Sequence, residues 1–215
     1  MLLFEGSPFY IGMAVILLSM LILKVARKKR YPFLLFYFVF CVYVLHVLKY
    51  TLFPIPVDPR VIAIHAGPAI DFSKGINLIP FSDSSMRNGF DREMLLNVLL
   101  TIPFGFGIPF LTRIHLKKLV LVGLTVGVTI ELLQLFLSLM LGFPYRYVDI
   151  NDVIHNFTGV LFGFLLFKIF AWLFTVSVER VKLPPNALLA YMHEVCSRSG
   201  TNTRKENADS SSIDC

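Results

Sequence analysis

The sequence predicts an all-α integral membrane protein, a bundle of about five transmembrane helices with the N-terminus outside and the C-terminus in the cytoplasm. Of its 215 residues 56% are hydrophobic and only 16% are charged, and the mean hydropathy is +0.71. Soluble domains carry about 25% charged residues. The charges are also unevenly spread, because five long stretches have almost none. Since one span takes roughly 20 apolar residues, these stretches predict about five crossings.

The five apolar stretches together contain only three formally charged residues, Lys49, Glu131 and Lys168. The first stretch is short, but its basic residues follow it and no small-residue cleavage site comes after it. We therefore expect an uncleaved helix there and not a signal peptide. The expected spans are Phe9 to Leu23, Tyr31 to Phe53, Met94 to Leu111, Leu119 to Leu141 and Val153 to Trp172.

The distribution of basic residues predicts which connections face the cytoplasm. Residues 24–30 hold five Lys or Arg and residues 112–118 hold three, with no acidic residue in either segment. The connections 54–93 and 142–152 balance their few basic residues against acids. The first pair of connections is therefore expected inside and the second pair outside, which orients all five spans.

The chain divides into an N-terminal helix with its basic loop (1–30), a main transmembrane domain (31–175) and a polar tail (176–215). The tail is rich in Ser, Asn and mixed charge after Ser197, so we expect it to be cytoplasmic and largely disordered. The net charge of +6 comes mostly from the inner loops and predicts contact with anionic lipid headgroups. Membrane lipids are the expected partners, and no nucleic-acid-binding motif is present.

Polar side chains recur in the outer halves of four of the five expected spans. Glu131 falls near the bilayer midplane, where an ionised side chain costs on the order of 2.5 to 3.5 kcal/mol, so it requires a partner or a wet cavity. Lys49 and Arg146 are the expected partners. Gln134 follows Glu131 by one helical turn on the same face. Asn97 and Asn156 occupy the outer ends of the third and fifth spans.

Small residues predict close packing among the last three spans. Gly159 and Gly163 form a small-xxx-small pair, which lets a neighbouring helix approach closely. Proline and glycine interrupt the helical hydrogen bonds of a span, and such breaks are tolerated where protein or water satisfies the freed carbonyls. The third span is therefore expected to be kinked and interior. It contains Pro103, Gly105, Gly107 and Pro109.

The outer connections add further candidates. The turn-forming stretch of residues 75–81 is too short to span and is expected at the outer interface, with its apolar residues in lipid. Arg146, Asp149 and Asp152 precede the last span, where a carboxylate favours a helix start and could also contact a ligand. The candidate ligand-binding residues are Asn77, Pro80, Phe81, Asn97, Glu131, Gln134, Arg146, Asp149, Asp152 and Asn156. The alternative is that Asn97, Gln134 and Asn156 only join helices by hydrogen bonds.

The same residues, taken in order, resemble the VanZ-like membrane proteins. The resemblance rests on the stretches 77–81 and 97–105, then Glu131 and Gln134, then the residues from Arg146 to Gly163, and it covers roughly residues 31 to 175. It implies a small multi-helix protein of the bacterial cytoplasmic membrane. The named member of that family is associated with resistance to teicoplanin, a glycopeptide with a lipid tail. The N-terminal helix and the polar tail lie outside the resemblance.

Three functions remain open at this point. The leading hypothesis is a non-enzymatic envelope protein whose outward polar pocket binds a lipid-linked cell-wall precursor or a lipidated glycopeptide, with no cofactor, metal or catalytic residue. The second is an intramembrane enzyme that acts on a lipid or cell-wall precursor through Glu131, Asp149, Asp152 and His155, by metal or acid/base chemistry. The third is a transporter, although five helices without an internal repeat are few for alternating access.

Overall fold

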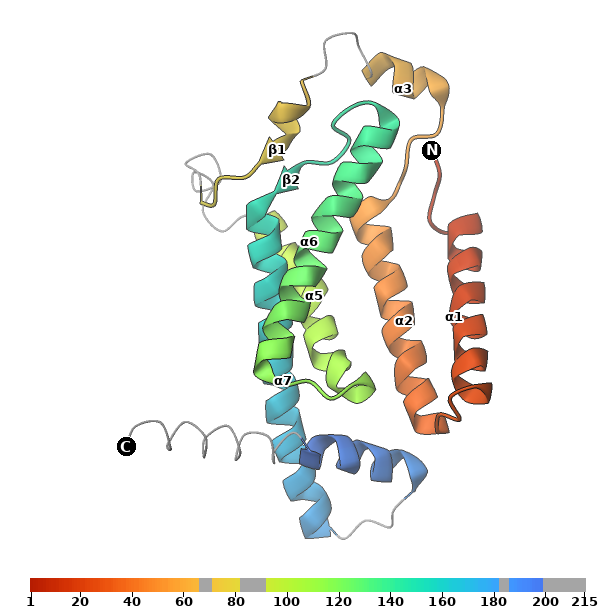
Figure 1. Ribbon diagram of the computed structural model, residues 1–215, viewed down its shortest axis with the longest axis vertical. Coiled ribbons are helices and arrows are strands. Elements are labelled where there is room, and N and C mark those ends of the chain that lie inside the picture. Colours follow the sequence, from red (N-terminus) through yellow and green to blue (C-terminus); the bar gives the residue numbers. More distant parts are fainter. Residues whose placement is uncertain (66–70, 82–91, 182–185, 199–215) are drawn as a thin grey trace.

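The computed structural model confirms the predicted fold class. It describes residues 1–65, 71–81, 92–181 and 186–198. The described residues form five helices that are long and apolar enough to cross a membrane (Figure 1). They are α1 (Ser7–Val25), α2 (Tyr31–Leu52), α5 (Arg92–Leu111), α6 (Leu116–Leu141) and α7 (Ile150–Val181).

The ends of these helices follow local sequence signals. Pro32 lies in the first turn of α2, where a missing N–H leaves no hydrogen bond unmade. Gly142 ends α6 with a φ of 77°, a left-handed conformation that glycine adopts without steric cost. At 32 residues α7 measures about 48 Å, longer than the hydrocarbon core, and it continues past the predicted end at Trp172.

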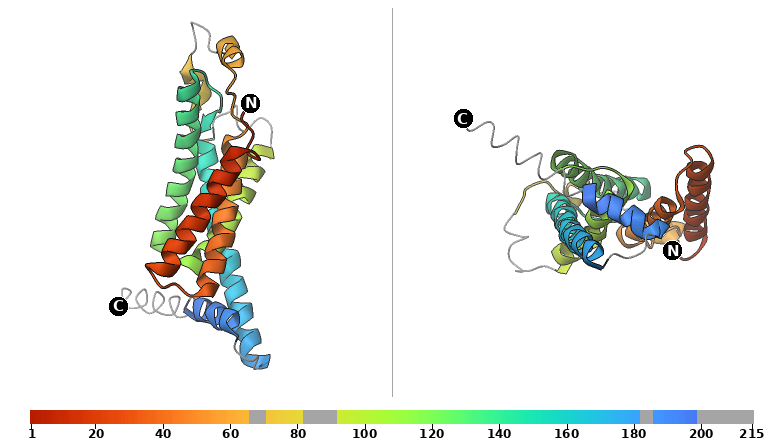
Figure 2. Two further views of the ribbon diagram at one scale, coloured as in Figure 1. Left: turned by 90° about the vertical axis from the view of Figure 1, so that its right-hand side faces the viewer. Right: turned by 90° about the horizontal axis from the view of Figure 1, so that it is seen from below.

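Helix α7 packs against both α5 and α6, and α5 also packs against α2. Helix α1 packs against α2 and lies at the edge of the bundle (Figure 2). The interior position of α5 is supported by Tyr43 of α2, whose hydroxyl donates to the carbonyl of Leu100 at 2.6 Å. Both Pro103 and Pro109 lie within α5.

Glycines bring the backbones of α5 and α7 into direct contact. A Cβ at Gly159 would overlap the carbonyl of Val98 and the hydroxyl of Thr101, and one at Gly163 would overlap the carbonyl of Ile102. These two α7 positions therefore leave no room for a side chain, as in close crossings of membrane helices generally.

The two ends of the bundle differ in structure. One end, which we call the sheet end, holds α3 (Pro59–His65), the 3-10 helix η1 (Phe72–Gly75) and a parallel pair of short strands. The strands are β1 (Ile76–Asn77) and β2 (Val148–Asp149), and Asn77 pairs with Asp149. The N-terminus lies at this end (Figure 1), where Leu2 bridges to Ile55.

The opposite end, which we call the basic end, holds the connections that follow α1 and α5 and a helix over residues 187–198. This C-terminal helix lies within the segment 176–215, which we predicted to be largely disordered, so the prediction was wrong for these residues. Helix α7 also continues into that segment, to Val181. Residues 199–215, for which disorder was also predicted, lie outside the described residues.

Apolar side chains dock the C-terminal helix against the bundle. Val195 and Cys196 are buried in one cluster with Phe110 and Phe167. The hydroxyl of Tyr191 donates a hydrogen bond to the carbonyl of Phe110, at the end of α5. The apolar side chains that follow Pro184 and Pro185 thus form a buried face of the C-terminal helix, although the tail as a whole has a polar composition.

This docking predicts a slow reaction of Cys196 with maleimide. Burial raises the pKa of the Cys196 thiol to about 11, so the thiolate is scarce at neutral pH. In a variant with Cys41→Ala and Cys215→Ala, we expect labelling at pH 7 to be about 100-fold slower than that of a free cysteine. Adding Tyr191→Ala should accelerate it by releasing the helix. If the variant that retains Tyr191 were labelled as fast as the denatured chain, the result would contradict the docking.

Candidate functional site

The carboxylate of Glu131 is the most deeply buried charged group that the structure describes. Its residue is only 5% exposed. One carboxylate oxygen, Oε2, accepts a hydrogen bond of 3.0 Å from the backbone N–H of Asp149 in β2. Asp149 and Asp152, which lie close to it, add like charge and no compensation. Among the described residues, no Lys or Arg lies within ion-pair distance of Glu131.

The expected pairing of Glu131 with Lys49 or Arg146 was therefore wrong. The Lys49 ammonium forms an ion pair with Glu5, because the N-terminal segment folds back over the end of α2. Arg146 donates from Nη2 to the carbonyl of Phe53 at 3.1 Å. The connection between α6 and α7 turns back so that a neutral backbone N–H, and not a cation, meets the carboxylate.

Asp149 joins two connections that are far apart in the sequence, the one before α5 and the one before α7. Its carboxylate accepts hydrogen bonds of 3.1 Å from the Asn77 amide and of 2.8 Å from both the backbone N–H and the side-chain amide of Asn151. The Asn151 side-chain oxygen accepts in turn from the N–H of Phe81 at 2.9 Å. Asn151 was missed in the sequence analysis, although an Asn at the start of a helix is a common signal for such bonds.

The stretch that includes Pro80 and Phe81 presents apolar side chains beside this network. Leu78 is 70% exposed, Ile79 68% and Phe81 59%. The backbone behind them is held, because the Asn77 side-chain oxygen accepts from the N–H of Ile79 at 3.2 Å. A fixed backbone with exposed apolar side chains fits the expected place at a membrane interface.

Asn156 of α7 carries a buried amide without a partner. The residue is 1% exposed, and neither its side-chain nitrogen nor its oxygen has a hydrogen-bond partner among the described residues. The bond between α5 and α7 comes from Thr101, whose hydroxyl donates to the backbone carbonyl of Asn156 at 2.8 Å and lies 3.0 Å from that of Asn97. Leaving a buried amide unpaired costs about 1 to 3 kcal/mol, so this side chain has capacity for a ligand.

Gln134 and Arg146 attach the sheet end of α6 to the end of α2. The Gln134 amide donates to the carbonyl of Thr51 at 3.3 Å, which is the helix-joining role that the alternative predicted for it. The Gln134 oxygen Oε1 and the Arg146 nitrogen Nε are buried and have no partner among the described residues. Ser138, which the sequence analysis passed over, accepts from the N–H of Arg146 at 3.1 Å and fixes the connection after α6.

Asp152 and His155 form a weaker pair at the start of α7. The imidazole Nδ1 lies 3.8 Å from the carboxylate Oδ1. Within the described ranges, His, Cys, Asp and Glu side chains form no group of three or more that could hold a metal ion. The described residues therefore give the metal form of the enzyme hypothesis no ligand set.

The residues brought together at this end define what we call the polar site. Glu131, Asp149, Asn77 and Asn151 are linked directly, and Asp152 lies close to Glu131. Gln134 of α6 and Asn156 of α7 lie within two turns of these residues, Arg146 lies in the connection before β2, and all three carry unpaired atoms. The polar site comprises Asn77, Glu131, Gln134, Arg146, Asp149, Asn151, Asp152 and Asn156.

A model of the VanZ/LLP1 family matches residues 40–171. The matched segment begins within α2 and ends within α7, so it includes the whole polar site and excludes α1 and the C-terminal helix. No curated protein and no solved structure matches the chain.

Proposed function

The chain belongs to the VanZ/LLP1 family of membrane proteins, and from this premise we propose that its polar site binds the polar head of a lipid-linked or lipidated ligand. The protein is then a non-enzymatic component of the bacterial cell envelope. The observation that carries the proposal is the buried carboxylate of Glu131, which no described cation neutralises. A membrane protein holds such a group where a ligand or a cavity compensates it.

The unpaired polar atoms supply the rest of the recognition chemistry. Asn156 offers a donor and an acceptor, Gln134 an acceptor and Arg146 a donor, all of them buried. Binding sites place a few such groups among apolar walls to fix the orientation of a ligand. A head group rich in hydroxyl and amide groups, such as a sugar or a peptide, satisfies this mixture of donors and acceptors.

The apolar surface beside the polar site favours an amphiphile. Leu78, Ile79 and Phe81 extend from the backbone that Asn77 and Asn151 hold. A ligand whose tail lies in the bilayer reaches the site along the membrane surface and keeps its tail in lipid. Two ligand classes have this form, lipid-linked cell-wall precursors and lipidated glycopeptides. Binding of either one lowers the susceptibility of the cell to teicoplanin-like antibiotics.

The test is expression of the chain in a glycopeptide-susceptible bacterium. We expect the inhibitory concentration of teicoplanin to rise by more than that of vancomycin, because vancomycin lacks the lipid tail. A strain that carries the empty vector gives the baseline. Equal shifts for the two antibiotics, or no shift at all, would count against the link to lipidated glycopeptides.

A further inference from the structure

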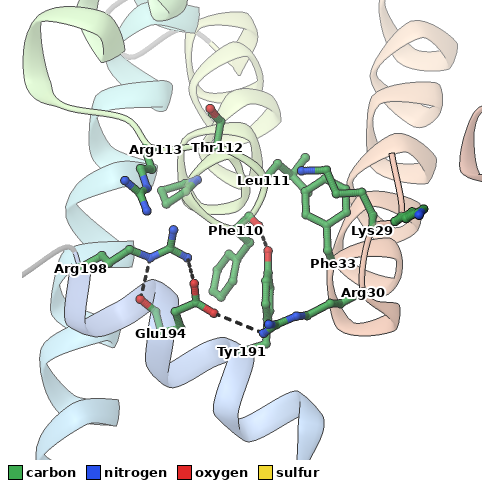
Figure 3. Close-up of a pocket in the computed structure, with 12 residues that line it drawn as sticks. Lys29, Arg30, Phe33, Phe110, Leu111, Thr112, Arg113, Tyr191, Glu194 and Arg198 are labelled. Atoms are coloured by element: carbon green, nitrogen blue, oxygen red, sulfur yellow. Dashed lines mark hydrogen bonds and ion pairs between the residues drawn. The ribbon is translucent and has the colours of Figure 1, made fainter. Parts of the chain in front are cut away.

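The basic end of the bundle holds a cavity, which is far from the polar site. It has a volume of about 700 Å³, within the range of small-molecule sites, and lies between the connection after α1, the end of α5 and the C-terminal helix (Figure 3). We call it the basic cavity. It is lined by Lys28, Lys29, Arg30, Phe33, Pro109, Phe110, Leu111, Thr112, Arg113, Tyr191, Glu194 and Arg198.

The charges of the basic cavity are not balanced. Five Lys and Arg side chains line it against one carboxylate, that of Glu194. Glu194 lies 3.4 Å from Arg198 and 4.0 Å from Arg30, so its single charge is already shared. Among the described residues, no carboxylate lies within ion-pair distance of the other three cations. An anion with more than one negative charge, or several anions, would be required to neutralise the cavity.

The shape of the cavity combines this charge with an apolar wall. Phe33, Phe110 and Leu111 line it beside the cations. The Lys29 ammonium lies 4.6 Å from the centre of the Phe33 ring. Figure 3 shows Lys29 and Arg30 on one side of the cavity and Arg113 and Arg198 on the other, so that cations flank the space between them.

Docking of the C-terminal helix fixes the geometry of one wall. Tyr191 holds the helix to the end of α5 through the carbonyl of Phe110, and the rings of Phe110 and Phe36 stack 4.4 Å apart. The Arg198 guanidinium is itself positioned, because its Nε donates to the backbone carbonyl of Glu194 at 2.8 Å. The Arg198 side chain therefore has little conformational freedom to lose when an anion binds.

We propose that the basic cavity binds the phosphate group of an anionic membrane lipid. The cavity lies at the ends of α1, α2 and α5, the depth at which headgroups meet membrane helices. Basic pockets between helices on the cytoplasmic side are suited to such headgroups. The apolar side chains accommodate the first methylenes of the acyl chains while the flanking cations contact the phosphate. This proposal does not depend on the function of the polar site.

The test is native mass spectrometry of the full chain in detergent, titrated with phosphatidylglycerol. The double variant Lys29→Ala with Arg113→Ala is expected to bind about 30-fold more weakly than wild type, at roughly 1 kcal/mol per basic residue. Its matched control is Lys117→Ala with Lys118→Ala, which removes the same charge at the same end but lies outside the cavity lining. The control should bind as wild type. Equal weakening in both double variants, or in neither, would overturn the proposal.

Two further arms complete the test. Glu194→Gln is expected to tighten binding, because it removes the one carboxylate among the described residues that pairs with Arg30 and Arg198; weaker binding would contradict the charge argument. Inorganic pyrophosphate, titrated without lipid, distinguishes a lipid headgroup from a soluble phosphate. Binding of pyrophosphate alone, with the same dependence on Lys29 and Arg113, would overturn the assignment to a lipid. All variants change exposed side chains, so their thermal midpoints should stay near that of wild type.

Discussion

Gly159→Ala is expected to remove most of the folded protein from the membrane. An added Cβ at this position would overlap the Val98 carbonyl and the Thr101 hydroxyl, and a backbone carbonyl within a helix cannot move aside cheaply. Overpacking of a tight interior costs about 1 to 3 kcal/mol. Thr101 of α5 and Asn156 of α7 join the two helices by a hydrogen bond. Separation of α5 from α7 would therefore also open the polar site.

The direction in which Gly159→Ala changes the stability tests the contact between α5 and α7. Alanine is favoured over glycine within a helix by about 1 kcal/mol, so Gly159→Ala should stabilise the protein if the contact with α5 were absent. Gly6→Ala controls for the added methyl group alone: Gly6 lies at the N-cap of α1, outside a helix interior, and its Cβ would meet nothing closer than the Leu3 carbonyl at 3.6 Å. Thermal midpoints in detergent and abundance in the membrane measure the difference. Two variants of equal stability would contradict the close approach of α5 and α7.

Glu131→Gln is expected to abolish the teicoplanin phenotype while the protein remains folded. Glutamine has nearly the same size as glutamate and keeps an oxygen that can accept from the N–H of Asp149, so the connection after α6 should hold. What disappears is the negative charge and with it a charge-assisted bond to the ligand. Such bonds contribute about 1.5 to 3 kcal/mol, which corresponds to a roughly 10- to 100-fold loss of affinity.

Glu5→Gln provides the control for that experiment. It makes the same chemical change at the same end of the bundle, but Glu5 is exposed and pairs with Lys49 outside the polar site. Exposed ion pairs contribute little to stability. We expect Glu5→Gln to keep both the phenotype and the membrane abundance. Loss of membrane abundance in Glu131→Gln would indicate that the carboxylate serves the fold and not a ligand.

The segregation of charge along the chain was sufficient to predict the fold class and the five spans. The exposed faces of membrane helices are apolar, so hydropathy marks where a helix crosses without any knowledge of its neighbours. Helix ends were less predictable. α7 continues beyond Trp172 because helical hydrogen bonds do not stop at the membrane boundary, and hydropathy does not report them.

The C-terminal helix shows why composition failed for the tail. Tyr191, Val195 and Cys196 are spaced four and one residues apart and cover one face of a short helix. That face is buried against Phe110 and Phe167, which lie far away in the sequence. A mean over the segment 176–215 dilutes this face with the polar residues that follow it.

The candidate residues were identified by their polarity at membrane depth, and the structure brings Asn77, Asp149 and Glu131 into one network. Their partners could not be predicted in the same way. Depth places Lys49 and Glu131 at comparable levels, but it does not give the direction of a side chain or the path of a connection. The N–H of Asp149 carries no signal in the sequence, since every residue except proline has one.

Direct binding to the polar site is the decisive measurement. We would titrate teicoplanin, and separately a lipid-linked cell-wall precursor, into the full chain in lipid nanodiscs, with wild type, Glu131→Gln and Glu5→Gln compared in parallel. The account predicts that wild type and Glu5→Gln bind at least one of these ligands equally well and that Glu131→Gln binds it at least about tenfold more weakly. Equal binding by all three proteins, or no binding of either ligand to wild type, would contradict it.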